Sequence, residues 1–430
     1  MVGKGTLIVI LGFSLIFALA SKYWDRESTD AAENFVQYYD QTVAHTIAVS
    51  GANLGANQVY LDTTSSTVSF SFSGSLSGGT YSVNCISLGQ YADSLVSIGK
   101  YQDTTSTVVV RFGPQYFSIF GIYTATMNNV AWATGDTVWG RFHSNGTFNV
   151  MGDPVFYGRV TSLNAYHEYT PGDTAIIYGS YQSGINIPMP NTSISNMLSA
   201  AAGGFLLSNP NSGKAYDVYL TFNSNGTATY YTNLNSTPVT EPITSIAPNG
   251  VIFVQNGNLH VHGTVSGQVD VGASGSSSAN YGSVFIDGNL ECNSDPQSNP
   301  NSTDVIGVVA QNNVTVMGDN DFMNYYHNGS LAADPPINPT IEAAIYAQNG
   351  SFSAYYQGTP NYGVGTSYLL STLGSVNVYG SISNYQIGVT SDPNIRYGYN
   401  AHYRFDPRFN NIAPPYFPLT GKYQILSWYE

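Results

Sequence analysis

Residues 6–20 read TLIVILGFSLIFALA, an uncharged apolar run that continues without a proline into a second segment ending near Tyr60. In that second segment, apolar side chains recur at steps of three, four and seven residues, which is the spacing of one face of an α-helix. These side chains are Phe35, Val36, Tyr39, Val43, Ile47 and Leu54. The pattern predicts one long helix over residues 1–60, with Gly51 and Gly55 as points where it kinks, ends or packs closely against a partner.

The apolar run itself has more than one interpretation. Lys4, the apolar residues behind it and the small residues at 18–20 resemble a cleaved export signal. A membrane span needs about 20 apolar residues, a length that the run reaches only when Ser21 and Lys22 are counted with it. The helical pattern after the run favours a continuous helix over a cleaved signal.

The composition of the rest of the chain indicates a β protein with a polar, weakly charged surface. Only 9% of the 430 residues are charged, against about a quarter in ordinary soluble domains. The chain has 34 tyrosines and 44 glycines, which suit sheets and tight turns. A net charge of −14 with 12 Lys and Arg argues against nucleic acid as a partner, because phosphate binding needs clustered cations.

From residue 61 the periodicity changes from helical to alternating, as at Val68, Phe70 and Phe72, and this predicts a β-rich region over 61–245. A short helix is expected at 193–202. Further strands are expected at Thr107–Phe112, Ile176–Gly179, Tyr216–Phe222 and Thr227–Tyr231.

The region 246–395 contains five similar phrases, most of them centred on Asn-Gly or Asp-Gly. They are VIFVQNGNLHVHG at 251–263, SVFIDGNLEC at 283–292, GVVAQNNVTVMG at 307–318, AIYAQNGSFSAYY at 344–356 and LLSTLGSVNVYG at 369–380. Their spacing favours the stacked coils of a β-solenoid. A series of hairpins is the alternative, because Asn-Gly between alternating apolar residues is also a hairpin signal.

A sixth phrase, VWGRFHSNGTFNVMGDPVFYG at 138–158, suggests that the solenoid begins early and that 163–245 is a long insertion. The segment 396–430 contains Asp406-Pro407 and Pro414-Pro415, then an apolar strand. We expect it to cap the last coil, or to dock back on the N-terminal helix. The expected fold is therefore mainly β, with a long N-terminal helix, a β-rich region and a right-handed-type β-solenoid head.

Residues 3–60 resemble the N-termini of minor type IV pilins and related pilin-like proteins. The resemblance implies that a prepilin peptidase cuts after Gly5, which makes Thr6 the first mature residue. Major pilins of that family carry glutamate at the fifth mature position, where this chain has Ile10. This departure implies a minor, tip-like or merely anchored subunit. The resemblance places these side chains in the membrane or in a filament core: Leu7, Ile8, Ile10, Leu11, Phe13, Leu15, Ile16 and Phe17.

Three further stretches are similar to bacterial surface proteins of no known activity that join a pilin-like N-terminus to a β-helical head. They are residues 138–158, quoted above, NGVIFVQNGNLHVHGTVSG at 249–267 and YRFDPRFNNIAPPYFPLTGKYQILSWYE at 403–430. The resemblance covers most of the chain and implies architecture and location. It implies no reaction.

The sequence gives little support for a metal-binding site and does not decide whether the two cysteines form a disulfide. His260 and His262 share one face of a predicted strand, but a zinc site needs a further ligand, and only Asp270 or Asp287 on adjacent coils would approach. We therefore expect neither a metal nor a cofactor. Cys85 and Cys292 either form a disulfide or remain two separate buried thiols.

Enzymatic function is the alternative from another class. A secreted β-solenoid polysaccharide lyase or hydrolase would need paired carboxylates in a groove. The available carboxylates are Asp136, Asp153, Asp270, Asp287 and Glu291. Because no nucleophile, phosphate-loop or metalloprotease motif is present, we expect a protein that is not an enzyme.

The expected location is the cell envelope, with the membrane or other pilin-like subunits contacting residues 6–20 and the head exposed outside. Surface glycans are a further expected partner, because exposed aromatic rings stack on sugars. Tyr355, Tyr356, Tyr362 and Tyr368 cluster in a short Gly-rich stretch, for which sheet propensity is the plainer explanation.

Overall fold

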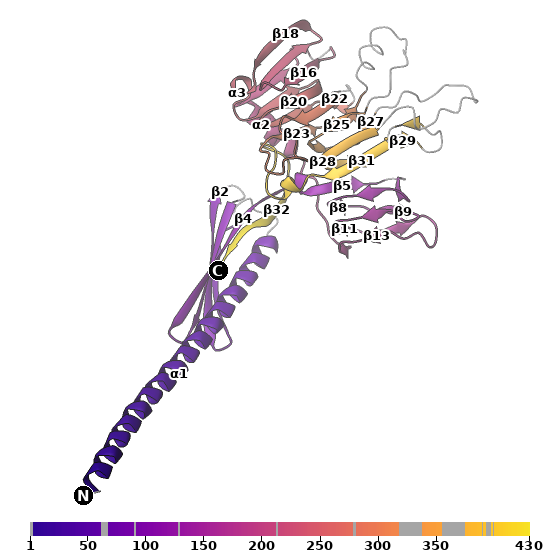
Figure 1. Ribbon diagram of the computed structural model, residues 1–430. Helices are drawn as coiled ribbons and strands as arrows, with labels where there is room; N and C mark the ends of the chain where they lie inside the picture. Colours follow the sequence, from indigo (N-terminus) through magenta and orange to yellow (C-terminus); the bar gives the residue numbers. More distant parts are fainter. Residues whose placement is uncertain are drawn as a thin grey trace. The chain divides into compact units, whose positions relative to one another are not determined.

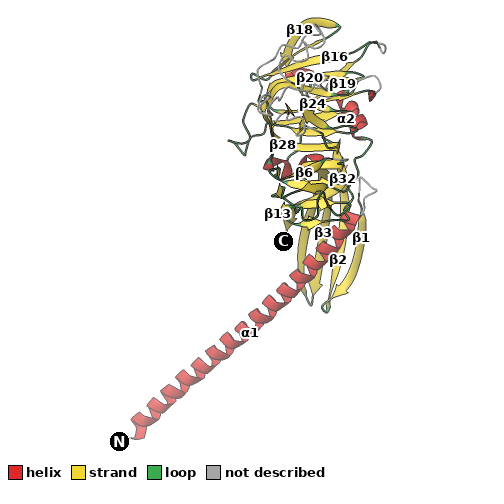
Figure 2. Cartoon of the chain, turned by 90° about the vertical axis from the view of Figure 1, so that its right-hand side faces the viewer, coloured by secondary structure: helices red, strands yellow, loops and turns green. Residues whose placement is uncertain are grey.

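The computed structural model describes residues 3–61, 68–89, 92–127, 130–211, 214–277, 281–317, 338–354, 375–388, 390–392, 397–398 and 400–430. The chain divides into two compact units. The first comprises Met1–Pro114 with Gly421–Glu430, and the second comprises Gln115–Thr420. A mainly β chain with a long N-terminal helix is confirmed (Figures 1 and 2).

Helix α1 spans Gly3–Leu61, 59 residues without a break, which corresponds to a length of about 90 Å. Its last third packs on the sheet of the first unit and buries a face of mostly small residues. The buried residues are Ala44, Ile47, Ala48, Gly51, Ala52, Gly55 and Val59. The apolar stripe that predicted the helix is not the face that packs on the sheet, because Phe35 and Leu54 are 70% and 50% exposed and only Ile47 of that set is buried.

Glycines on both elements allow α1 to approach the sheet closely. A Cβ added at Gly51 would lie 2.5 Å from Ser97 Oγ, and one added at Gly99 would lie 2.5 Å from the backbone nitrogen of Ala48. At the same interface Ser97 Oγ donates a hydrogen bond of 2.7 Å to the carbonyl oxygen of Ala48. Of the three roles considered for Gly51 and Gly55, close packing is the one that the structure shows.

The sheet of the first unit has the strand order β1-β2-β3-β4-β32. The first four strands form an antiparallel meander, whereas β32 comes from the C-terminal end of the chain. Their bounds are β1 Phe70–Leu76, β2 Gly79–Gly89, β3 Ala92–Tyr101, β4 Thr104–Tyr116 and β32 Leu419–Tyr429.

The prediction that 396–430 caps a solenoid is wrong for its last strand. Tyr423 of β32 is buried in the same apolar cluster as Ala48 and Ala52 of α1, and Glu430 lies 3.3 Å from His45. The alternative, in which the tail docks back on the N-terminal helix, is confirmed.

The second unit contains a long ladder of parallel strands. Its order is β15-β19-β21-β23-β26-β28-β5-β8-β11-β14. The bounds are β15 Phe205–Ser208, β19 Val251–Gln255, β21 Gln268–Ser274, β23 Val305–Ala310, β26 Ala344–Ala347, β28 Ser375–Gln386, β5 Phe120–Thr126, β8 Arg141–Ser144, β11 Val160–Ser162 and β14 Tyr181–Gln182.

A second parallel ladder runs through β16, β20 and β22, and then continues through shorter strands to β28 and β31. Strand β28 belongs to both ladders, with its first half in this one and its second half in the other. The bounds are β16 Asp217–Asn223, β20 Asn258–Val265, β22 Val284–Cys292, β24 Val314–Val316, β25 Thr340–Ile341, β27 Phe352–Ala354 and β31 Asn400–Phe405.

Shorter elements complete the second unit. Strands β16, β17 and β18 form an antiparallel meander, in which β17 pairs with both of its neighbours. Two three-stranded parallel ladders, β6-β9-β12 and β7-β10-β13, accompany β8 and β11. The bounds are β17 Thr227–Thr232, β18 Asn235–Pro242, β6 Ala131–Ala133, β9 Asn149–Met151, β12 His167–Glu168, β7 Thr137–Val138, β10 Val155–Phe156, β13 Ile176–Ile177, α2 Ser193–Ala201, α3 Ile243–Ile246, β29 Ser391–Asp392 and β30 Tyr397–Gly398.

The hairpin alternative fails at the Asn256-Gly257 turn. This turn connects β19 to β20, which lie in different ladders and pair with other strands in parallel. Asp287-Gly288, predicted as a turn, lies inside β22. Gly272, in a Gly- and Ser-rich stretch, lies inside strand β21.

The early phrase at 138–158 belongs to the main ladder and does not start a separate solenoid. Its strand β8 pairs with β5, and β5 pairs with β28 with Ile122 opposite Ile382. Strands from the first and last thirds of the chain therefore form one continuous stack, while the chain returns through α2 to start β15 at the far end of the ladder.

The core of the second unit is built mainly from Val, Ile and Ala of the two ladders. Strands such as β23 and β26 are buried along their whole length, as expected for parallel strands covered on both faces. This packing fixes the backbone of the turns between the ladders.

Candidate functional site

The first part of α1, residues 6–20, is an exposed apolar surface. Residues 3–39 are all exposed, and the helix contains a segment long and apolar enough to cross a membrane. The eight side chains that the pilin resemblance assigned to a membrane or filament core are each 60–72% exposed: Leu7, Ile8, Ile10, Leu11, Phe13, Leu15, Ile16 and Phe17. Gly5 and Thr6 lie in the same exposed part of the helix.

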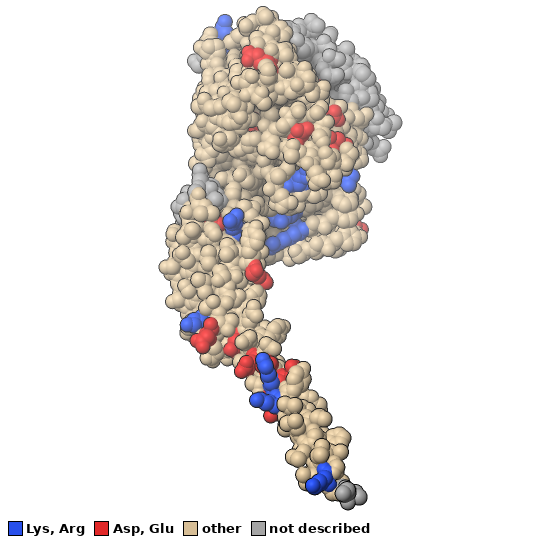
Figure 3. All heavy atoms as spheres, turned by 60° about the vertical axis from the view of Figure 1, so that its left-hand side comes forward, with Lys and Arg blue, Asp and Glu red and all other residues tan. Residues whose placement is uncertain are grey.

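Charged residues mark the end of this apolar surface. Lys4 is followed by no charged residue until Lys22, and then by a mixed cluster that includes Arg26 and Asp30 at 3.9 Å. Figure 3 shows this cluster part-way along α1, after an uncharged stretch. An apolar cylinder with charges at both ends is the pattern of a segment that is surrounded by lipid or by other apolar helices.

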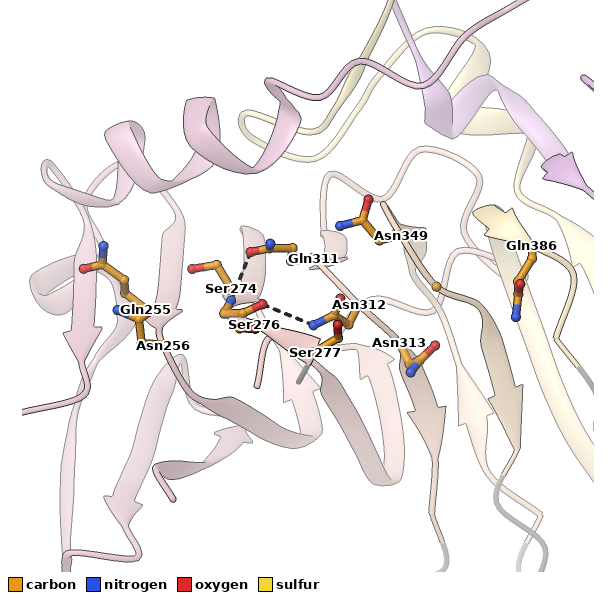
Figure 4. Close-up of a pocket in the computed structure, with 12 residues that line it drawn as sticks. Gln255, Asn256, Ser274, Ser276, Ser277, Gln311, Asn312, Asn313, Asn349 and Gln386 are labelled. Atoms are coloured by element: carbon orange, nitrogen blue, oxygen red, sulfur yellow. Dashed lines mark hydrogen bonds between the residues drawn. The ribbon is translucent and has the colours of Figure 1, made fainter. Parts of the chain in front are cut away.

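A polar groove of about 820 Å³ lies in the second unit, where the turns that follow β19, β21, β23, β26 and β28 meet (Figure 4). All of the residues that line it are uncharged. They are Gln255, Asn256, Ser274, Gly275, Ser276, Ser277, Gln311, Asn312, Asn313, Asn349, Gly350 and Gln386.

Some amides of the groove hold the turns together. Gln311 Oε1 accepts a hydrogen bond of 3.0 Å from the backbone nitrogen of Gly275, and Asn312 Nδ2 donates one of 3.2 Å to the carbonyl oxygen of Gly275 (Figure 4). Asn313 Oδ1 accepts one of 3.0 Å from the backbone nitrogen of Ser351. These bonds link turns that are more than 30 residues apart in the chain.

Other amides of the groove are exposed and uncommitted. The side chains of Asn256 and Asn349 are exposed and make no hydrogen bond within the part of the chain that the structure describes. From the sequence alone, the Asn-Gly pairs at these positions indicate only turns. The available signal was the repeat of Gln-Asn-Gly or Gln-Asn-Asn at 255–257, 311–313 and 348–350, which places amides at equivalent positions at the ends of β19, β23 and β26.

His260 belongs to a stack of rings on the second ladder and not to a metal cluster. Its ring lies 4.7 Å from those of Tyr219 and Phe285, the residues opposite it on β16 and β22. His260 Nδ1 lies 2.9 Å from Asp287 Oδ2, and His262 Nε2 lies 3.2 Å from Thr221 Oγ1. Among the described residues no group of three His, Cys, Asp or Glu side chains is placed to hold a metal ion.

The carboxylates considered for an enzyme serve other roles. Asp270 is fully buried, and Asp287 pairs with His260. Asp136 Oδ2 accepts a hydrogen bond of 2.7 Å from the backbone nitrogen of Ala133 and so closes a turn. Asp153 is exposed and Glu291 is half-buried. None of the five lines the polar groove.

The two thiols are buried and unbonded. Cys85 lies in β2 of the first unit, and Cys292 ends β22 of the second. Burial raises the pKa of each thiol to about 12, so both are protonated at neutral pH. The alternative of two separate buried thiols describes this structure. The tyrosine cluster at 355, 356, 362 and 368 lies outside the described residues.

No family model matches the sequence, and a search of curated proteins finds no match. A search of solved structures finds a likeness to the competence-associated pilin ComZ from Thermus thermophilus, with 12% sequence identity and a TM-score of 0.40. The match covers 91% of this chain and 96% of that chain. A likeness at this TM-score carries no argument about function.

Proposed function

We propose that this chain is a non-enzymatic structural protein of the cell envelope: a pilin-like subunit, minor or tip-like, of an extracellular filament, or a membrane-anchored adhesive protein. The observation that supports this proposal is the exposed apolar half of α1, which is continuous with the packed half. Each large apolar side chain that leaves water contributes about 1.5–3 kcal/mol. A row of them on one helix therefore favours a bilayer or a bundle of like helices.

In this proposal the head is a β-solenoid displayed outside the membrane. The parallel, in-register pairing of successive repeats supports it, because each strand covers the edge of the one before it. Right-handed coiling is proposed from the general rule for parallel crossovers.

The uncharged groove favours a binding role over a hydrolytic one. Glycoside hydrolysis by the usual mechanism needs two carboxyl groups about 5–10 Å apart. The described residues that line the groove supply only amides, hydroxyls and backbone groups. We therefore propose no reaction for this chain.

The N-terminus of the mature protein tests the proposal. Intact-mass and N-terminal peptide analysis of the protein from its native membranes is expected to find Thr6 as the first residue, as prepilin processing after Gly5 requires. Ser21 as the first residue would contradict the proposal, because the apolar segment would then be absent from the mature chain. An intact Met1 would support the anchored form and would exclude the filament form.

A Gly5→Val variant is the matched control for processing. It is expected to retain Met1, whereas a Gly12→Ala variant, in the same exposed helix, is expected to be processed normally. Shearing of the cells then separates the two forms, because a filament subunit appears in the sheared fraction and an anchored protein stays with the membranes.

A further inference from the structure

The polar groove of the second unit is a regular array of hydrogen-bonding groups. It spans the turns of five neighbouring strands of one parallel ladder, and neighbouring strands lie about 4.8 Å apart. In this ladder Gln255 pairs with Ser274, and Gln311 follows Ala310, the partner of Ala273. Gln255, Ser274 and Gln311 therefore lie at equivalent positions at the ends of β19, β21 and β23, and Asn349 and Gln386 continue the polar lining from β26 and β28 one position further along the chain.

The chemistry of the lining selects for a neutral partner. An amide side chain offers both donors and an acceptor, and a serine hydroxyl offers one donor and two acceptor positions. No charged side chain among the described residues lines the groove, so an anionic or cationic ligand would lose its hydration there without gaining an ion pair. The net charge of −14 further disfavours anions.

The hydrogen bonds within the groove preorganise it. The backbone of Gly275 holds both the Oε1 of Gln311 and the Nδ2 of Asn312, which leaves the amide nitrogen of Gln311 without a partner among the described residues. The exposed amides of Asn256 and Asn349 lie at either side of this fixed pair (Figure 4). The amide nitrogen of Gln311, whose side chain is held by its bond to Gly275, loses little entropy when a ligand binds.

We propose that this groove binds a neutral, linear polysaccharide, with its sugar hydroxyls paired to the amides and its long axis along the ladder. The strand spacing is close to the length of one pyranose unit in an extended chain, so successive sugars meet polar groups of successive strands. A volume of about 820 Å³ lies within the range of about 300–1,000 Å³ for small-molecule sites, and it accommodates an oligosaccharide. The proposal does not depend on how α1 is anchored.

The test is affinity electrophoresis of the full-length protein in a zwitterionic detergent, because glycosidic detergents would compete for the groove. The gels contain dextran, hydroxyethylcellulose, galactomannan or laminarin as neutral probes, and polygalacturonate as an anionic probe. At least one neutral probe is expected to retard the protein. The double variant Asn256→Asp with Asn349→Asp is expected to weaken that retardation at least tenfold.

Asn164→Asp is the matched control, because Asn164 is an exposed asparagine of the same unit outside the groove. It adds a negative charge without touching the groove and is expected to bind like the unmodified protein. Thermal unfolding of all variants verifies that the unit is folded. The proposal is overturned if no neutral probe retards the protein, if polygalacturonate alone does so, or if the folded double variant binds as tightly as Asn164→Asp.

Discussion

At the scale of single residues, the contact between α1 and its sheet depends on positions where no side chain is tolerated. A Cβ at Gly99 would overlap the carbonyl oxygen of Ala44 and approach the backbone of Ala48. Backbone atoms of a packed helix cannot move aside as the end of a flexible side chain does. Gly99 therefore fixes the distance between helix and sheet.

We expect Gly99→Ala to lower the free energy of unfolding of the first unit by about 1–3 kcal/mol, the usual cost of overpacking. Urea unfolding of the full chain measures this change. Gly12→Ala is the control, because nothing lies within 4 Å of the position that its Cβ would occupy. Equal stability of the two variants would show that the interface relaxes.

Asp270 makes the stability of the second unit depend on pH. Its carboxyl group is fully buried, both oxygens lack a hydrogen bond among the described residues, and burial raises its pKa well above the ordinary value. In the unfolded chain this group ionises near pH 4. As the pH rises above about 4, the unfolded state loses a proton that the folded state keeps, so stability falls.

Asp270→Asn is expected to remove this dependence. The variant should be more stable than the unmodified chain at pH 7 and should approach it at pH 3.5, where the carboxyl group is protonated in both states. Urea midpoints between pH 3.5 and 8 measure the difference, and Asp153→Asn, an exposed carboxylate, is the control. A constant difference across that range would contradict the assignment.

At the scale of elements, α1 has two halves with different environments. Among the described residues only the last third of α1 is packed, whereas the apolar run at 6–20 is exposed. An arginine in the middle of a membrane segment costs about 2.5–3.5 kcal/mol. We therefore expect Leu11→Arg to move the protein from the membrane fraction to the soluble fraction.

Co-flotation of the purified full chain with phospholipid vesicles measures this effect. Val36→Arg is the matched control, because Val36 is also exposed on α1 but lies beyond the apolar run. If both variants floated equally well with the vesicles, the run would not be the membrane contact.

The sequence predicted the positions of helices and strands better than it predicted which elements they pack or pair with. Periodicity located α1, the short helix α2 and strands such as β4, β16 and β17, because local spacing reflects burial. It did not reveal the face of α1 that packs on the sheet, because that face consists mostly of small residues such as Ala48 and Gly51, whereas large residues such as Phe35 are exposed. The sequence pattern did not predict strand β21, because Gly272 and Ser274 are residue types common in loops.

The groove was hidden for a related reason. Asparagine and glycine in 255–257 and 348–350 are strong turn formers, and that local role explained them fully. These residues also lie close together in space, and that depends on the register in which the strands pair. The register is set by how the strands pair in the folded protein, and the sequence of one strand does not determine it.

At the scale of the whole molecule, the two units have separate apolar clusters. Residues of α1, β2, β3, β4 and β32 form the first cluster, and the ladders of the second unit, together with α2 and neighbouring loops, form the others. We expect two unfolding transitions in calorimetry of the full chain. Gly99→Ala should lower the midpoint of one, and Asp270→Asn should raise the midpoint of the other at pH 7. A single transition that both variants shift would contradict this division.

The pairing of β5 with β28 can form only after most of the chain has been made or exported. Ser383 donates a hydrogen bond to the carbonyl oxygen of Phe117, a partner 266 residues earlier in the chain. A chain that is made or exported from its N-terminus presents the edge of β5 long before β28 arrives to cover it. Such distant pairing slows folding, and an open strand edge invites pairing with other chains. The speed of export, or a chaperone that shields this edge, thus becomes part of what makes the stack form correctly.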